Sequence, residues 1–299
     1  MFIWIIGLVL VVLLIALGLP IAFSMLIVGF LGLITLLGLD PALAMIGQIF
    51  FDNGMNYTLS ILPLFLLMGN FVVKAGLADE LYNTANAWLR HKKGGLAMAT
   101  IIACGGFSSV CGSSLATAAT MAKIALPSMK KYNYPDSLAT GAIAAGGTLG
   151  ILIPPSMILV LYGIITSQDI GQLFLAGIIP GLLGILGYII AVKISVSINK
   201  KSFKTQSALP LLEKIKSLKG VLGIISLFIL VMGGIYSGVF TATEAAGVGA
   251  FGSLIIVLIK KKITLNSFYE TLIETVKVTS MLFFLLFGAI LFSNFINLA

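Results

Sequence analysis

The stretch "GGTLGILIPPSMILV", residues 146–160, interrupts a segment that otherwise has the composition of a membrane-spanning helix. It opens with two glycines and continues to Pro154 and Pro155, which lack the backbone N–H groups that a helix requires. Inside a bilayer the freed carbonyl groups have no water to bind, so such a break persists only within protein or beside a wet cavity. We therefore predict a broken membrane helix, with the break at 146–156, whose free oxygens and amides hold a ligand.

The composition of the whole chain points to an integral membrane protein. Of 299 residues, 59% are hydrophobic and 9% are charged, whereas about a quarter of a soluble domain is charged. Apolar runs long enough to cross a bilayer as helices lie at 2–19, 20–39, 57–73, 171–192, 220–235 and 237–259. The first of them has no basic start and no small-residue cleavage site, so we expect a retained helix. The sequence predicts an all-α polytopic membrane protein.

The net charge of +8 is explained by topology, and not by nucleic-acid binding. No Lys or Arg precedes Lys74, and the basic clusters at 90–93, 130–131, 193–219 and 260–262 flank hydrophobic spans. The positive-inside rule places these clusters in the cytoplasm, next to anionic membrane lipid. The two cysteines, Cys104 and Cys111, have no His or acidic neighbours at metal-binding spacing, so we predict no cofactor and no metal bound by them.

The spacing of the charges also predicts the organisation of the chain. The stretch 94–129 leaves and returns to the same side, and its centre, "CGGFSSVCGSSLATAAT" (104–120), is rich in Gly and Ser. We favour a re-entrant hairpin there over two tight full spans. Amphipathic patterns at 77–90 and 263–277 predict interfacial helices. The predicted division is scaffold helices and a first interfacial arm (1–93), a transport element (94–194), and a cytoplasmic loop with the start of a second repeat (195–299).

A weak internal echo suggests an inverted repeat. "PLFLLMG" (63–69) resembles "LFFLLFG" (282–288), and the two predicted spans run in opposite directions. Inverted repeats of this kind are typical of secondary transporters. The counterparts of the hairpin and the broken span would lie beyond Ala299. We therefore expect an incomplete second repeat, with either a truncated chain or a partner polypeptide supplying the rest.

The hairpin and the broken span together form the candidate site. Unwound carbonyls and the hydroxyls near the hairpin tip (Ser108, Ser109, Ser113, Ser114 and Thr117) are hard oxygen ligands that suit a small cation such as sodium. Half-helix N-termini offer positive dipole ends to an anion. The alternative is that the small residues only allow close helix packing. No cluster of His, acid and Cys supports a protease, so no enzyme is predicted, and Thr241-x-x-Glu244 has the spacing of a capping box.

Four motifs resemble one known family. "GGFSSVCGSSLATAATMAKIALPSM", "TGAIAAGGTLGILIPPSMILVLYG", "FLAGIIPGLL" and "YSGVFTATEAAGVGAFG" look like the large, DctM-like membrane subunit of the tripartite ATP-independent periplasmic (TRAP) transporters. The resemblance implies an elevator-type symporter that uses sodium as its coupling ion. It would import organic anions such as C4-dicarboxylates, sialic acids or 2-oxo acids across the bacterial inner membrane. The implied partners are a small membrane subunit and a periplasmic substrate-binding protein.

The resemblance also assigns residues by position. It implies a cation site formed by Ser109, Ser113, Ser114, Thr117, Thr148, Gly150 and Pro154, and half of a substrate site formed by Ser114, Pro155 and Ser156. The family's second hairpin and second proline-containing break are not in this sequence. Two other functions stay open: a sodium/dicarboxylate carrier that needs no binding protein, and a truncated fragment that does not transport.

Overall fold

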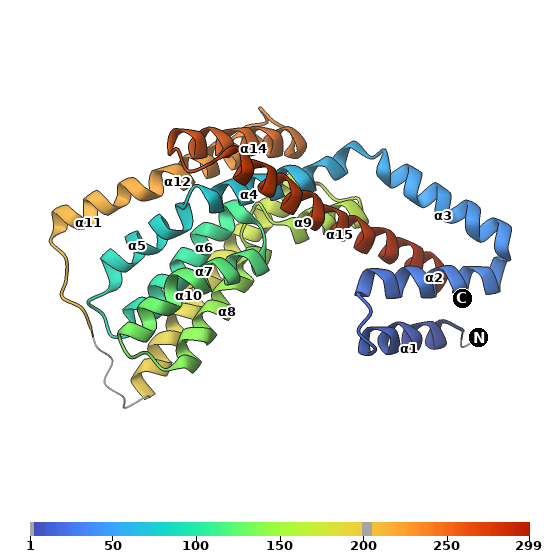
Figure 1. Ribbon diagram of the computed structural model, residues 1–299. Helices are drawn as coiled ribbons and strands as arrows, with labels where there is room; N and C mark the ends of the chain where they lie inside the picture. The colour runs from blue at the N-terminus through green and yellow to red at the C-terminus, as the bar shows by residue number, and fades with distance from the viewer. Residues whose placement is uncertain (1–2, 199–204) are drawn as a thin grey trace. The chain divides into compact units, whose positions relative to one another are not determined.

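The structure, a computed structural model, describes residues 3–198 and 205–299, and within them the regular elements are all helices. Among these described residues, six helical stretches are long and apolar enough to cross a membrane: Tyr57–Lys74, Asp136–Thr166, Ile170–Ile198, Leu211–Tyr236, Ala242–Ile259 and Leu265–Leu298. This confirms the predicted all-α polytopic fold. The chain forms two compact units, one of Met1–Ser60 with Ile273–Ala299 and one of Ile61–Leu272, drawn in Figure 1.

The described part of the first unit contains four α-helices with aromatic side chains at their centre, and the short 3-10 helix η1 (Tyr57–Ser60). The α-helices are α1 (Ile3–Ala16), α2 (Ile21–Leu37), α3 (Leu39–Gly54) and the C-terminal part of α15 (Leu265–Leu298). The turn at Gly18, where φ is +92°, and Pro20 separate α1 from α2. At 1.5 Å per residue, α1 is about 21 Å long and α2 about 26 Å, so both predicted spans (2–19 and 20–39) are shorter than expected.

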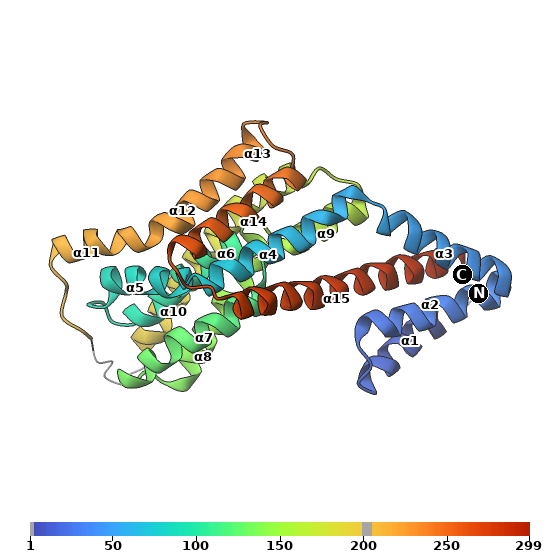
Figure 2. The same ribbon diagram turned by 45° about the horizontal axis from the view of Figure 1, so that its top comes forward.

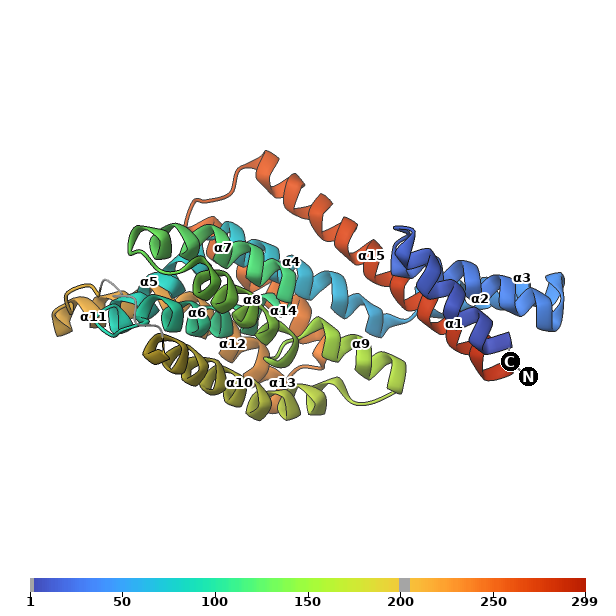
Figure 3. The ribbon, with the colours of Figure 1, turned by 90° about the horizontal axis from the view of Figure 1, so that it is seen from below.

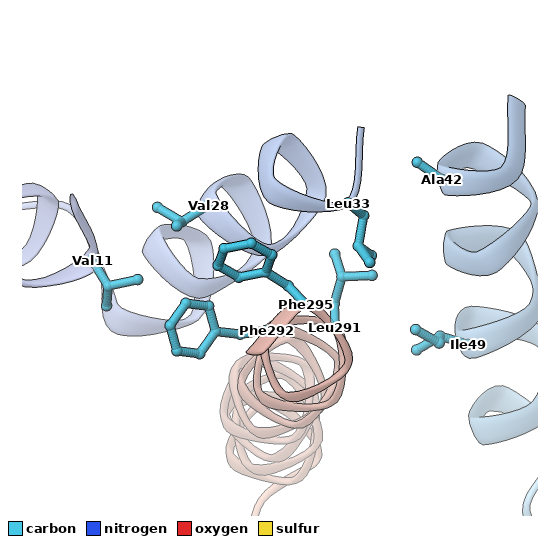
Figure 4. Close-up of a cluster of buried hydrophobic side chains, with 8 residues drawn as sticks. All are labelled: Val11, Val28, Leu33, Ala42, Ile49, Leu291, Phe292 and Phe295. Atoms are coloured by element: carbon cyan, nitrogen blue, oxygen red, sulfur yellow. The ribbon is translucent and has the colours of Figure 1, made fainter. Parts of the chain in front are cut away.

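Two phenylalanines of α15 fill the core of this unit. Figure 4 shows Phe292 and Phe295 among apolar side chains of the other three helices. A Cβ at Gly32 would lie 2.3 Å from the ring of Phe295, and one at Gly7 would lie 2.4 Å from it. The two glycines therefore leave the space that the Phe295 ring occupies, and Phe295 is 1% exposed.

The second unit is a helical bundle with α6 at its centre (Figure 3). Helix α6 packs against α5, α7, α8 and α10, and most of its residues are buried. Helix α4 runs beside α14, as Figure 2 shows. The elements of the unit are α4 (Ile61–Lys74), α5 (Leu77–Leu89), α6 (Gly95–Cys111), α7 (Ser114–Lys131), α8 (Asp136–Leu152), α9 (Met157–Thr166), α10 (Ile170–Ile198), α11 (Leu211–Ser217), η2 (Leu218–Val221), α12 (Leu222–Phe228), η3 (Ile229–Gly233), α13 (Gly234–Tyr236), α14 (Ala242–Ile259) and the start of α15.

Polar contacts fix the ends of several of these helices. The predicted capping box at the start of α14 is confirmed: the Glu244 carboxylate accepts from the Thr241 N–H at 2.8 Å, and Thr241 Oγ1 accepts from the Glu244 N–H at 3.3 Å. At the other end of α14, Lys260 pairs with Glu80 of α5. The hydroxyl of Thr84 donates to the Ser217 carbonyl at 2.7 Å, which ties α5 to α11.

One of the two predicted amphipathic helices forms as a separate helix, and the other does not. The first, 77–90, forms as α5. The second, 263–277, does not form a separate helix, because it continues without interruption into the following span as α15. No Gly or Pro lies between Leu265 and Phe287 to end the helix. The interfacial position of these segments, the functional division at 93 and 194, the inverted repeat and the elevator motion stay predictions.

Candidate functional site

The predicted hairpin is a pair of helices joined by a two-residue tip. Helix α6 ends at Cys111, and Gly112 adopts a left-handed conformation (φ +62°) while its N–H donates to the Ser108 carbonyl at 3.0 Å. Ser113 is extended, and its Oγ accepts from the Ala116 N–H at 3.4 Å. The tip therefore presents the serine-capped N-terminus of α7. That the hairpin is re-entrant stays a prediction.

The predicted broken span is also present. Helix α8 ends at Leu152, the chain is non-helical from Ile153 to Ser156, and α9 starts at Met157. Ser156 is fully buried, and its hydroxyl both donates to the Ile151 carbonyl at 2.7 Å and accepts from the Leu159 N–H at 3.4 Å. A single side chain thus satisfies an orphan carbonyl of α8 and an orphan N–H of α9.

The hairpin tip lies directly against the break. The Met157 N–H donates to the Gly112 carbonyl at 3.4 Å, and a Cβ at Gly112 would lie 2.7 Å from the Pro155 oxygen. One helical turn before the break, a Cβ at Gly150 would lie 2.9 Å from the Ser114 nitrogen. The two irregular elements that the sequence singled out are therefore in contact, with the N-termini of α7 and α9 beside each other.

The break is shorter than we predicted. Residues 146–152 are helical, so only the last four residues of the expected 146–156 break leave the helix. The glycines serve close packing instead. A Cβ at Gly146 would lie 2.7 Å from Cys104 Sγ, and one at Gly147 would lie 2.8 Å from Ala118 Cβ. Gly150 still lies against the hairpin tip, but it is a helical residue, and its lack of a side chain lets the tip approach.

Thr148 is not at the hairpin tip. Its hydroxyl donates to the Ala145 carbonyl at 2.7 Å and lies 2.8 Å from the Tyr188 hydroxyl of α10. Gly147 and Gly150 face α7, and Thr148 points about 100° away from Gly147 because each helical residue turns by that angle. The sequence analysis missed Tyr188, although a lone tyrosine in the apolar run "GILGYII" is a signal for a polar partner.

The other predicted hydroxyls divide into two groups. Ser113 and Thr117 belong to the tip, where the buried Thr117 hydroxyl donates to the Ser113 carbonyl at 2.8 Å. Ser114, half-buried, is the first residue of α7. Ser109 donates to the Gly106 carbonyl at 2.7 Å and lines an apolar cavity together with Pro154. Ser109 and Pro154 therefore lie on a different side of the break from the α7 contact.

Two oxygens near the tip, one of a side-chain hydroxyl and one of a backbone carbonyl, lack a usual hydrogen-bond donor. The Ser108 hydroxyl is fully buried and has no hydrogen-bond partner in the described part of the chain. The Gly150 carbonyl cannot receive the usual helical bond, because its donor four residues on would be Pro154, which has no N–H. An unsatisfied buried polar group costs about 1–3 kcal/mol, so these oxygens are candidate ligands for a cation.

Glycines of α10 close the other side of the break. A Cβ at Gly177 would lie 2.5 Å from the Leu152 carbonyl oxygen, and one at Gly181 would lie 2.7 Å from the Ile153 side chain. Both positions are buried. The break is thus packed against the hairpin tip on one side and against α10 on another.

Comparisons with known proteins agree with this architecture. A sequence profile described as "Tripartite ATP-independent periplasmic transporter, DctM component" matches residues 8–299. The chain is 39% identical over 245 residues to the C4-dicarboxylate TRAP transporter large permease protein DctM of Pseudomonas aeruginosa, covering 82% of this chain and 57% of that protein. It is 36% identical over 280 residues to the sialic acid TRAP transporter large permease protein SiaM of Vibrio cholerae, covering 92% of this chain and 64% of that protein.

A third relative carries a composite name. The isethionate TRAP transporter permease protein DctMQ of Oleidesulfovibrio alaskensis is 31% identical over 262 residues, which cover 85% of this chain and 40% of that protein. The chain thus spans less than two thirds of the length of each of these relatives.

Proposed function

The chain belongs to the family of the DctM component of the tripartite ATP-independent periplasmic transporters, and we propose that it forms part of a sodium-coupled importer of small organic anions. It is a multi-pass protein of the bacterial inner membrane. The observation that carries this proposal is the contact between the hairpin tip and the break, at Gly112 with Pro155 and Gly150 with Ser114. The relatives are permeases by name, and we assign this chain a transport role, with no enzymatic one.

The oxygens at this contact support a sodium site. Sodium, like other hard cations, prefers oxygen ligands, and unwound backbone carbonyls supply such ligands in transporters. The Ser108 hydroxyl has no hydrogen-bond partner in the described part of the chain, and the Gly150 carbonyl has no N–H four residues on, because that residue is Pro154. Ser113, Ser114 and Thr117 bring three further hydroxyls to the same place.

The helix N-termini at this contact support binding of an anion. Helix α7 has 18 residues and α9 has 10, and both start at the tip–break contact with a capping serine. Each N-terminus carries a partial positive charge from the aligned peptide dipoles. The names of the relatives specify a C4-dicarboxylate, a sialic acid and isethionate, all of them organic acids. We therefore assign Ser114, Pro155 and Ser156 to one wall of the anion site.

A periplasmic substrate-binding protein and a small membrane subunit complete the proposed system. The tripartite name of the family and the relative named DctMQ support both partners. A test is uptake into liposomes that contain this chain and the small subunit, with loaded binding protein outside. Uptake is measured for the chain as it is and for a form extended with the part of the Vibrio relative that the match does not cover.

The expected result is uptake of a labelled anion that requires both an inward sodium gradient and the binding protein. Uptake that needs sodium but no binding protein would replace the tripartite assignment with a two-component carrier. Sodium-independent uptake, or no uptake by either form, would contradict the proposal.

A further inference from the structure

An apolar cavity of about 280 Å³ lies behind the break, on the side away from the α7 contact. It is framed by α6, the break, α10 and α12, and Leu81 of α5 also lines it. Among the described residues that line it, Ser109 alone carries a hydroxyl, and that hydroxyl is already bonded to the Gly106 carbonyl. An apolar cavity of about 150 Å³ already accommodates benzene and excludes water, so this larger one suits an apolar occupant.

The cavity is lined in part by exposed side chains of two long apolar helical stretches. Leu182 of α10 is 56% exposed and Ile225 of α12 is 46% exposed, and both line the cavity. Both helices belong to predicted membrane spans, Ile170–Ile198 and Leu211–Tyr236. Hydrocarbon tails are as apolar as leucine and surround such spans, so an acyl chain of a membrane lipid is the apolar molecule available to enter between α10 and α12.

A lysine stands at the rim of the cavity. Val221 lines the cavity, and Lys219 precedes it by two residues in η2. Lys219 is exposed and has no ion-pair partner among the residues that the structure describes. The stem of the Glu80 side chain packs against Gly220. The carboxylate of Glu80 is already paired with Lys260. A free cation therefore lies where the headgroup of a lipid whose tail fills the cavity would sit.

The sequence places this rim in the cytoplasmic leaflet. Lys219 belongs to the basic stretch 193–219, which the positive-inside rule assigns to the cytoplasm. That leaflet carries the anionic lipids to which each juxtamembrane Lys or Arg contributes attraction. From Val221 at the end of η2 to Phe228 at the end of α12, the cavity wall is about 10 Å long. It leads away from Lys219, in the direction that an acyl chain would take.

We propose that this cavity is a binding site for one anionic phospholipid, with an acyl chain between α10 and α12 and its phosphate at Lys219. The site is separate from the proposed sodium and anion site, because the break itself lies between them. It does not depend on the proposed function.

The test is lipid retention by the purified full chain, measured by native mass spectrometry. The chain is exposed to equal amounts of phosphatidylglycerol and phosphatidylcholine with identical acyl chains, and then washed in detergent. We expect one phosphatidylglycerol molecule to be retained, about fivefold in preference to phosphatidylcholine, as one juxtamembrane lysine supports. Lys219→Ala should abolish the preference, whereas Lys130→Ala, which removes an exposed lysine at the end of α7, should leave it unchanged.

Cavity-filling variants test the position of the acyl chain. Val221→Trp should remove retention of both lipids. Ile225→Trp should do the same, and Ile225 is half-exposed, so a larger side chain is tolerated there. Retention that survives in both folded variants would overturn the proposal, because the lipid would then be bound outside the cavity. Equal retention of the two lipids by the unchanged chain would overturn the assignment of Lys219.

Discussion

Gly150 of α8 lies against the backbone of Ser114, so closely that a Cβ at Gly150 would be 2.9 Å from the Ser114 nitrogen. The contact joins two elements that are 36 residues apart in the sequence and that are each irregular for a membrane helix. It depends on a glycine, because any side chain would meet backbone atoms that cannot move aside. The proposed sodium site rests on this contact.

Adding one methyl group at Gly150 should separate the hairpin tip from the break. We expect Gly150→Ala to destabilise the chain by about 1–3 kcal/mol, as overpacking does, and to weaken stabilisation by sodium. Thermal unfolding of the purified chain in detergent measures both effects.

Gly141→Ala is the matched control for this prediction. Gly141 lies on the same helix with nothing within 4 Å of its Cβ position, so alanine should stabilise the helix by up to about 1 kcal/mol. Equal effects of the two substitutions would show that the contact at Gly150 does not matter.

The two serine caps should differ in their contribution to stability. Both Ser113 and Ser156 accept an N–H at 3.4 Å, but Ser156 also donates to the Ile151 carbonyl. Ser113→Ala should cost about 0.5–2 kcal/mol, the usual cost of a lost cap. Ser156→Ala should cost more than Ser113→Ala, by about 0.5–1.5 kcal/mol, since it also removes the hydrogen bond to the Ile151 carbonyl. Similar unfolding free energies for the two variants would contradict this interpretation of the break.

The Thr148–Tyr188 hydrogen bond should couple α8 to α10 without affecting sodium. A double-mutant cycle with Thr148→Val and Tyr188→Phe should give a coupling of about 0.6 kcal/mol, the average for such bonds between membrane helices. Thr140→Val, whose hydroxyl bonds only within α8, should be additive with Tyr188→Phe. A change in the sodium response of Thr148→Val would contradict this expectation and support the sequence-based prediction that Thr148 belongs to the cation site.

Most of the fold follows from local sequence signals. The length of the apolar runs predicts the spans, and the adjacent prolines at 154 and 155 predict the break, because two successive residues without an N–H disturb a helix more than one does. The single prolines Pro127 and Pro180 stay inside α7 and α10. The glycine and serine content of 104–120 predicts the hairpin. These signals act within a few residues, so the sequence alone suffices for them.

The details of the site depend on tertiary contacts that the sequence does not display. A glycine both weakens a helix and permits close packing. Gly146, Gly147 and Gly150 are helical residues of α8 that pack against α6 and α7, although we expected them in the break. The partner of Thr148 depends on the rotation of α8 relative to α10. The unpaired state of the Ser108 hydroxyl becomes visible only when all its neighbours are known.

The central claim is that the tip–break contact binds sodium, and the Ser108→Ala variant tests it most directly. The measurement is the thermal unfolding midpoint in sodium chloride and in potassium chloride at equal concentration. A ligand at 100 times its dissociation constant stabilises a protein by about 2.7 kcal/mol, so the unchanged chain should unfold at a higher temperature in sodium. The control is Thr100→Val on the same helix, whose hydroxyl bonds to the Leu96 carbonyl and which should keep the sodium effect.

For Ser108→Ala the account predicts an unfolding midpoint in potassium that is unchanged or higher, because a buried unpaired hydroxyl has been removed, and loss of the increase in sodium. If the unchanged chain unfolds at the same temperature in both salts, or if Ser108→Ala retains the full sodium effect, the claim is contradicted.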